Sequence, residues 1–136
     1  MSYLDTKKFD QYFTAILTDI EIKKQVDYGN KASVRRCNAA NDRIRKHLLL
    51  IDKEFLPNDE IINYLLSHSE SRVISHTAVV MQDFVNCTTA QKLMGLKNLK
   101  KLIADHKLSG PDALTLSMLF IPKAEAKLLK EVKGNT

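Results

Sequence analysis

The chain has 136 residues and a formal net charge of +5, with 44% hydrophobic and 27% charged residues. This length suits one domain with a core of its own, and the composition excludes a mostly disordered, fibrous or low-complexity chain. Four glycines and three prolines are few helix breakers for such a length, so long uninterrupted helices are expected.

The first half of the chain predicts two long helices. Apolar residues recur at steps of three and four over residues 9–20, which is typical of an amphipathic helix, and the turn at 28–30 ends it. A second helix is expected over 31–54, because its apolar residues follow a nearly heptad spacing. Pro57 disfavours helical geometry at the residue before it and so ends this helix.

The second half predicts shorter helices that follow one another closely. Asn58 caps the helix over 59–67. The helix over 72–84 is apolar on most sides, which indicates an inner helix. The helix over 112–121 is short and almost entirely apolar, so it is also expected to be an inner helix. These helices span 59–67, 72–84, 88–106 and 112–121, and a last one follows Pro122.

No segment alternates between apolar and polar residues for long enough to indicate a strand. The predicted fold class is therefore all-α, with six or seven helices in one domain over residues 1–136. The order of a short helix, a tight turn and an inner helix, followed by a second such pair, favours a short right-handed stack of antiparallel helix pairs.

Three motifs around the inner helix resemble a HEAT repeat, in which a leucine-rich helix meets a turn with a polar cap and a Val/Arg pair, followed by small residues. They are Leu65-Leu66, Ser71-Arg72-Val73 and Thr77-Ala78. Over residues 20–121 the chain resembles a family of small bacterial HEAT-like domains of unknown function. The resemblance implies an α-solenoid with a protein-binding surface, and it implies no catalytic residue.

Neither a membrane span nor a targeting segment is predicted. No run of about 18 apolar residues occurs, and residues 1–8 lack the apolar core and cleavage site of a signal peptide. The two cysteines, Cys37 and Cys87, have no zinc or redox spacing. We therefore expect a cytoplasmic protein in a reducing setting.

Residue patterns typical of catalysis or metal binding are missing from the sequence. The four histidines form no metal-ligand motif, and no glycine-rich phosphate loop or nucleophile elbow occurs. His76 borders an apolar face, where it is either a packing residue or a functional one. Cys87 precedes a helix start, which can lower a thiol pKa, but the sequence shows no histidine or acid that would pair with this thiol. The sequence predicts a protein that is not an enzyme and has no cofactor.

Positive charge is concentrated in two segments. Residues 31–53 carry a net charge of +5 and residues 92–107 a net charge of +4, while the segment 54–91 between them carries −4. Such segments are either solvated outer helix faces or a surface that attracts an acidic protein or a polyanion. The candidate binding residues are the densest basic patch, Arg35, Arg36, Arg43, Arg45 and Lys46, and the polar strip of the inner helix, Arg72, Ser75, Gln82 and Asp83.

A polar seam accompanies the apolar stripe of the second helix. Asn38, Asn41 and Arg45 share one face, and Asp52 lies seven residues further on. Two interpretations stay open: the seam bonds to the ends of neighbouring helices, or it lines a polar pocket.

The function predicted from the sequence is a protein-interaction module, monomeric or homodimeric, whose partner is acidic. A specific form of this hypothesis is an immunity or antitoxin protein that blocks a partner enzyme. The alternative is a nucleic-acid-binding protein that uses the basic second helix for phosphate contacts. No aromatic residue for base stacking lies between Tyr28 and Phe55, which favours the protein partner.

Overall fold

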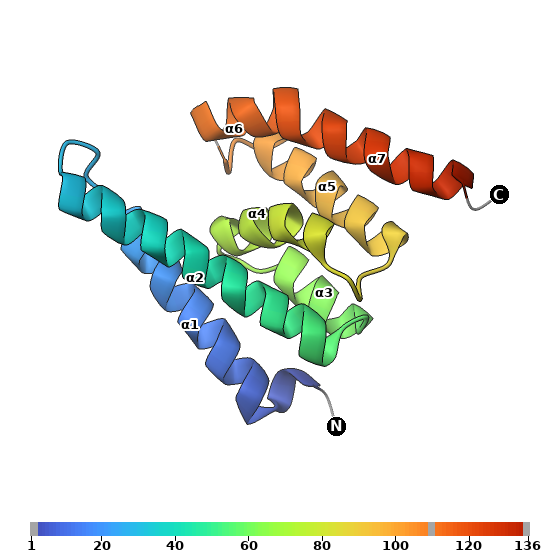
Figure 1. The fold of residues 1–136 in the computed structure, drawn as a ribbon, viewed down its shortest axis with the longest axis horizontal. Coiled ribbons are helices and arrows are strands. Elements are labelled where there is room, and N and C mark those ends of the chain that lie inside the picture. The colour runs from blue at the N-terminus through green and yellow to red at the C-terminus, as the bar shows by residue number, and fades with distance from the viewer. Residues whose placement is uncertain (1–2, 109–110, 135–136) are drawn as a thin grey trace.

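The computed structural model describes residues 3–108 and 111–134, and within these residues every long regular element is a helix (Figure 1). The all-α class and the number of helices are thus confirmed. The helices are α1 (Lys7–Lys24), α2 (Lys31–Phe55), α3 (Asp59–Leu66), α4 (Ser71–Val80), α5 (Thr89–Ala104), α6 (Pro111–Thr115) and α7 (Ile121–Gly134). A π turn (Leu116–Phe120) joins α6 to α7, so that these two form one continuous rod.

Side-chain caps explain where four of the helices begin. In each case a side-chain oxygen just before the helix accepts a hydrogen bond from a backbone N–H in the first turn, at 3.0–3.3 Å. Gln91 also bonds back to the N–H of Thr88, which completes a capping box at α5. The four capping residues are Thr6, Asn30, Asn58 and Thr88.

Helix α4 lies at the centre of the packing. α1 and α2 form an antiparallel hairpin, α4 packs on both of them and on α5, and α7 lies along α5 (Figure 1). One hydrophobic core runs from α1 to α7. Each large apolar side chain buried there contributes about 1.5–3 kcal/mol to the free energy of unfolding. Its fully buried members include Ile16, Ile20, Ile44, Leu48, Ile51, Ile61, Leu65, Met81, Phe84, Leu96 and Leu99.

The C-terminal rod differs from the prediction for residues 112–121. Leu114, Met118 and Leu119 are 60%, 66% and 68% exposed, so the prediction of an inner helix there is wrong. The physical reason is that the rod packs along α5 on one side only, and no described residues of the chain cover its outer side. Pro122 does not break the rod: it lies in the first turn of α7, directly after the π turn.

Helix α4 begins one residue before the predicted range 72–84 and ends four residues before its predicted end. Its cap is Glu70, whose carboxylate accepts from the N–H of Arg72 at 3.2 Å. The α-helix ends at Val80 and not at Phe84, and a 3-10 turn (Met81–Asp83) follows. The chain leaves the helix through this turn, and Phe84, the residue after the turn, is buried in the core.

Helix α5 ends in a Schellman motif. The N–H of Lys107 donates to the carbonyl of Leu102 at 2.9 Å, and the N–H of His106 donates to the carbonyl of Ile103 at 3.1 Å. His106 has φ of 58°, in the left-handed region where a side chain is disfavoured.

Replacing His106 with glycine is expected to raise the free energy of unfolding by about 1 kcal/mol, because glycine adopts this backbone conformation without the steric cost. Urea unfolding followed by circular dichroism measures the change. An alanine at the same position serves as the control, since it keeps a β-carbon and should bring no such gain. Equal stabilities of the glycine and alanine variants would contradict the argument.

Candidate binding site

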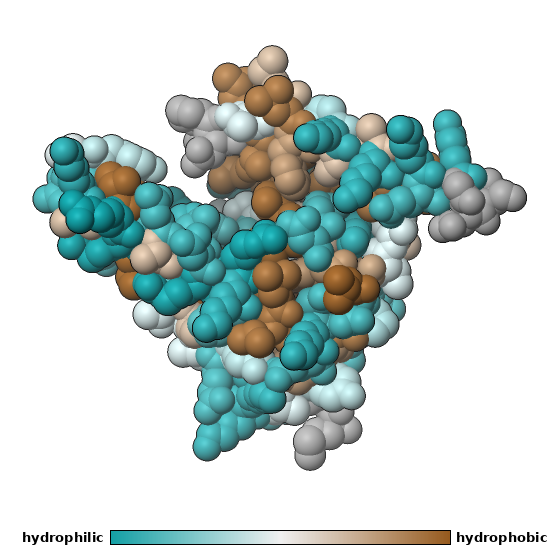
Figure 2. All heavy atoms as spheres, viewed as in Figure 1, coloured by the Kyte–Doolittle hydropathy of each residue, from teal (hydrophilic) through white to brown (hydrophobic). Residues whose placement is uncertain are grey.

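A cleft opens between the tip of the α1–α2 hairpin and the elements α4 and α6. Figure 2 shows the surface hollowed between these two parts of the molecule. The cleft has a volume of about 610 Å³, and its lining combines cationic, polar and apolar side chains. The lining includes Lys23, Lys24, Tyr28, Asn41, Arg72, Ser75, His76, Val79 and Leu116.

Three cationic side chains from two helices meet at this cleft. The Lys23 ammonium lies 2.9 Å from Asn41 Oδ1 and 3.0 Å from His76 Nε2. Lys24 forms an ion pair with Glu70, and the guanidinium of Arg72 lies 3.9 Å from the same carboxylate. The hydrogen bond from Lys24 lowers the pKa of Glu70, so this acid is ionised at neutral pH. Lys24 also pairs with Glu21 at 3.0 Å, so three cations meet two carboxylates and the mouth of the cleft keeps one positive charge.

His76 is neutral at pH 7. Burial in the cleft wall, followed by the charges of Lys23 and Arg72, lowers the pKa of this histidine to about 4. A neutral imidazole offers one ring nitrogen as an acceptor, and Nε2 takes that role toward the Lys23 ammonium, which can only donate. His76 is thus a packing residue that positions a cation, which fits the first of the two interpretations from the sequence.

The lowered pKa of His76 predicts a loss of stability in mild acid. Because the unfolded chain binds the proton near pH 6.5 and the folded chain only near pH 4, stability is complete above pH 6.5 and falls as the pH drops through this window. We expect the free energy of unfolding to fall by about 2 kcal/mol between pH 7 and pH 5. Urea titrations of the native chain and of His76→Gln at both pH values measure it. Parallel losses in the two proteins would contradict the prediction.

The structure brings Arg72 and Ser75, two of the candidate residues, into this cleft. Sequence reasoning missed Lys23 and Lys24, which face them from the last turn of α1. The available signal was a pair of lysines just before the predicted turn at 28–30. Nothing in the local sequence, however, indicates that this turn lies beside α4.

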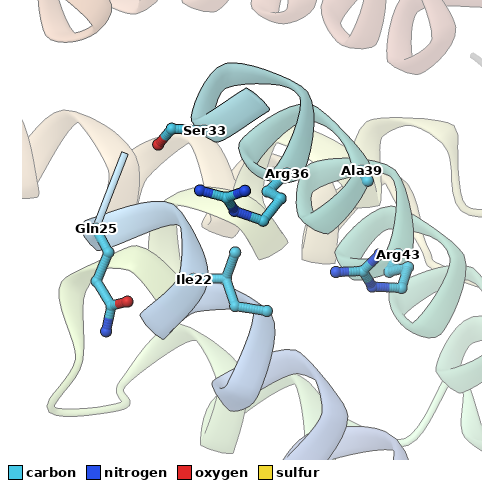
Figure 3. A pocket seen from close by; sticks show the side chains of 6 residues that line it. All are labelled: Ile22, Gln25, Ser33, Arg36, Ala39 and Arg43. Atoms are coloured by element: carbon cyan, nitrogen blue, oxygen red, sulfur yellow. The ribbon is translucent and has the colours of Figure 1, made fainter. Parts of the chain in front are cut away.

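Arg36 and Arg43 lie on another face, at the seam between α1 and α2. They border a shallow pocket of about 310 Å³, where Arg36 extends over Ile22 (Figure 3). Arg43 bonds to one oxygen of the buried Asp19, from Nε at 3.0 Å and from Nη2 at 2.8 Å. Arg43 therefore holds α2 to α1, while Arg36 makes no ion pair with any described residue.

The remaining candidate residues are divided between structural bonds and open surface. Arg45 forms an ion pair with Asp83 at 2.9 Å. Gln82 donates to the carbonyls of Ala78 and Lys92, which ties α4 to α5. Arg35 and Lys46 are exposed, and neither makes an ion pair with a described residue. The nine candidates thus form no single surface.

The polar seam of α2 bonds to neighbouring segments. Asn41 accepts from Lys23, Arg45 pairs with Asp83, and the buried Asp52 accepts from backbone amides of the loop after α4. Three of its four residues therefore have the structural role that was one of the two interpretations. Asn41 also lines the cleft, so the pocket interpretation holds for that residue as well.

Cys87 offers no activated thiol. Burial raises the pKa of Cys87 to about 11, so its thiol is protonated at neutral pH. Cys37 is half-buried in the wall of the cleft. Over residues 3–108 and 111–134, no group of three or more His, Cys, Asp or Glu side chains lies close enough together to hold a metal ion.

None of the helices in the described part of the chain is both long enough and apolar enough to cross a membrane. Comparison of the chain with models of known families, with curated proteins and with solved structures finds no match. The HEAT-like family and the right-handed stack of helix pairs therefore stay predictions from the sequence.

Proposed function

We propose that the protein is a binding module without catalytic activity, and that the cleft takes an acidic segment of a partner protein. The observation that carries the proposal is the meeting of Lys23, Lys24 and Arg72 around one concavity. Cations gathered in a concave site focus the electric field there and attract carboxylates.

The apolar part of the lining supports a peptide over a free anion. Val79 and Leu116 form part of the wall beside the cations, and the exposed ring of Tyr28 lies at the rim. A segment that places an apolar side chain against this wall and a carboxylate beside Arg72 would use both kinds of contact. Buried apolar anchors supply most of the affinity in such interfaces, while charge pairs set specificity and the rate of association.

The proposal is tested with the full-length chain as bait in an extract of the organism that makes it, with captured proteins identified by mass spectrometry. The Arg72→Glu variant is expected to lose the partner, because a glutamate would repel the acidic segment and Glu70 already lies beside this position. Lys97→Glu, an exposed change on α5 outside the cleft, is the matched control. A partner captured equally by all three proteins would refute the proposal.

A more specific form of the proposal is an immunity or antitoxin protein that covers a partner enzyme in the cytoplasm. Cys37 and Cys87 are free thiols, which suits a reducing compartment. A toxin-like reading frame directly upstream of the gene supports this form, and a partner without enzymatic activity contradicts it.

The second candidate function is nucleic-acid binding along α2. Arg35, Arg36 and Lys46 are exposed and make no ion pair with the described residues, so they are available to phosphates. Titration of the chain with duplex DNA at increasing salt separates the two functions. A steep loss of affinity with salt, which Arg36→Glu makes shallower, supports nucleic acid. Arg43 is unsuitable for this test because it pairs with the buried Asp19.

A further inference from the structure

A second groove lies between α7, α5 and the turn after α4, and it is separate from the cleft. Its volume is about 600 Å³. Phe120, Ala124 and Leu128 follow one another at four-residue spacing along the C-terminal rod and form its apolar floor. Leu128 is buried, whereas Phe120 and Ala124 are half-buried and remain open to a ligand.

The rim of this groove is strongly cationic. Lys123, Lys127 and Lys130 follow α7 beside the floor, and Lys92 faces them from α5. None of these four lysines makes an ion pair with a described residue. The acids on the rim are Glu131 and Asp83, and Asp83 is already paired with Arg45 at 2.9 Å.

We infer that this groove binds an acidic amphipathic helix of a partner protein. The floor runs from Phe120 to Leu128, eight residue steps along the C-terminal rod. At 1.5 Å per step this is about 12 Å, which matches two turns of a docked helix. Apolar side chains of that helix at every third or fourth position would cover Phe120 and Ala124. Glutamates or aspartates on either side of its apolar stripe would meet the lysines on both rims.

The chemistry of the groove argues against two other occupants. Nucleic acid would use the lysines for phosphate contacts but would find a single half-buried ring, that of Phe120, for base stacking in the floor. A second copy of α7 would bring Lys123, Lys127 and Lys130 opposite the same cations, which costs free energy. An acidic amphipathic helix would cover the apolar floor with its apolar face and pair its carboxylates with the lysines of the rim.

The test is a selection with the full-length chain against a displayed library of short helical peptides. Apolar residues are fixed at helical spacing in these peptides, and the other positions vary among Glu, Lys, Ser and Ala. Glutamate is expected to be enriched in the binders. A synthetic peptide of the enriched sequence should bind about tenfold more weakly to the double variant Lys123→Glu/Lys127→Glu. Ala126 is exposed and also lines the groove, so Ala126→Trp, which fills the groove without changing its charge, should weaken binding as well.

The matched control is Lys97→Glu/Lys101→Glu, which reverses two exposed charges of α5 outside the groove and should leave peptide affinity unchanged. Arg72→Glu should also leave it unchanged, so a failure here is distinguishable from a failure of the proposed cleft. The inference is overturned by enrichment of lysine or of no residue, by equal losses in the test and control double variants, or by binding to duplex DNA in place of the peptides.

Discussion

Replacing Asp52 with alanine is expected to lower the free energy of unfolding by about 4 kcal/mol, because two hydrogen bonds to a charged group at about 1.5–3 kcal/mol each are lost. The carboxylate is only 3% exposed. Its Oδ2 accepts from the N–H of Val85 at 2.9 Å, and its Oδ1 accepts from the N–H of Asn86 at 3.0 Å. Without it, the loop between α4 and α5 loses two of its bonds to α2, while the bond from Asn86 Nδ2 to the backbone carbonyl of Asp52, at 3.1 Å, remains.

Urea unfolding of the native chain and of Asp52→Ala, followed by circular dichroism, measures this difference. Asp42→Ala is the matched control, since it removes an exposed aspartate from the same helix and should change stability by less than about 0.5 kcal/mol. Asp52→Asn keeps one acceptor oxygen and should fall between the two. Similar losses in Asp52→Ala and Asp42→Ala would show that the loop does not depend on this carboxylate.

Asp52 also shows which features of the fold could be predicted from the sequence and which could not. Its place on the polar seam of α2 indicated a structural role as one of two interpretations, but the amides that it binds belong to residues more than thirty positions further along the chain. Helix periodicity and capping depend on neighbouring residues, which is why α1, α2 and α5 were predicted almost to their ends. The partner of a buried polar group depends on the tertiary fold.

The same limit applies to the candidate site. Basic residues of α2 are close in sequence, and their spacing already places Arg36 and Arg43 on one side of the helix and Arg45 on another. The cleft, by contrast, joins the end of α1 to α4, and only the packing of these helices brings Lys23 to His76. The exposed residues of the C-terminal rod were missed because an apolar run looks the same whether or not another element covers it.

Replacing Gly95 with valine is expected to lower the free energy of unfolding by about 3 kcal/mol, because the new side chain overpacks the contact between α5 and the turn after α4. A β-carbon at this position would overlap the sulfur of Met81. Met81 is fully buried, so its thioether has no solvent-exposed space into which to move. Alanine in place of Gly95 meets the same overlap, and its gain in helix propensity of about 1 kcal/mol does not offset the strain.

The close approach of Gly95 to Met81 makes the two positions energetically coupled. Met81→Ala alone leaves a cavity that costs about 2–5 kcal/mol. In the double variant the valine fills part of that cavity, so the combined loss should be smaller than the sum of the single losses by at least about 1 kcal/mol. Ala104→Val, an exposed change near the end of the same helix, should cost only about 0.5 kcal/mol. Additive losses at positions 81 and 95 would contradict this prediction, because they would show that the contact with Met81 is not the cause of the loss at position 95.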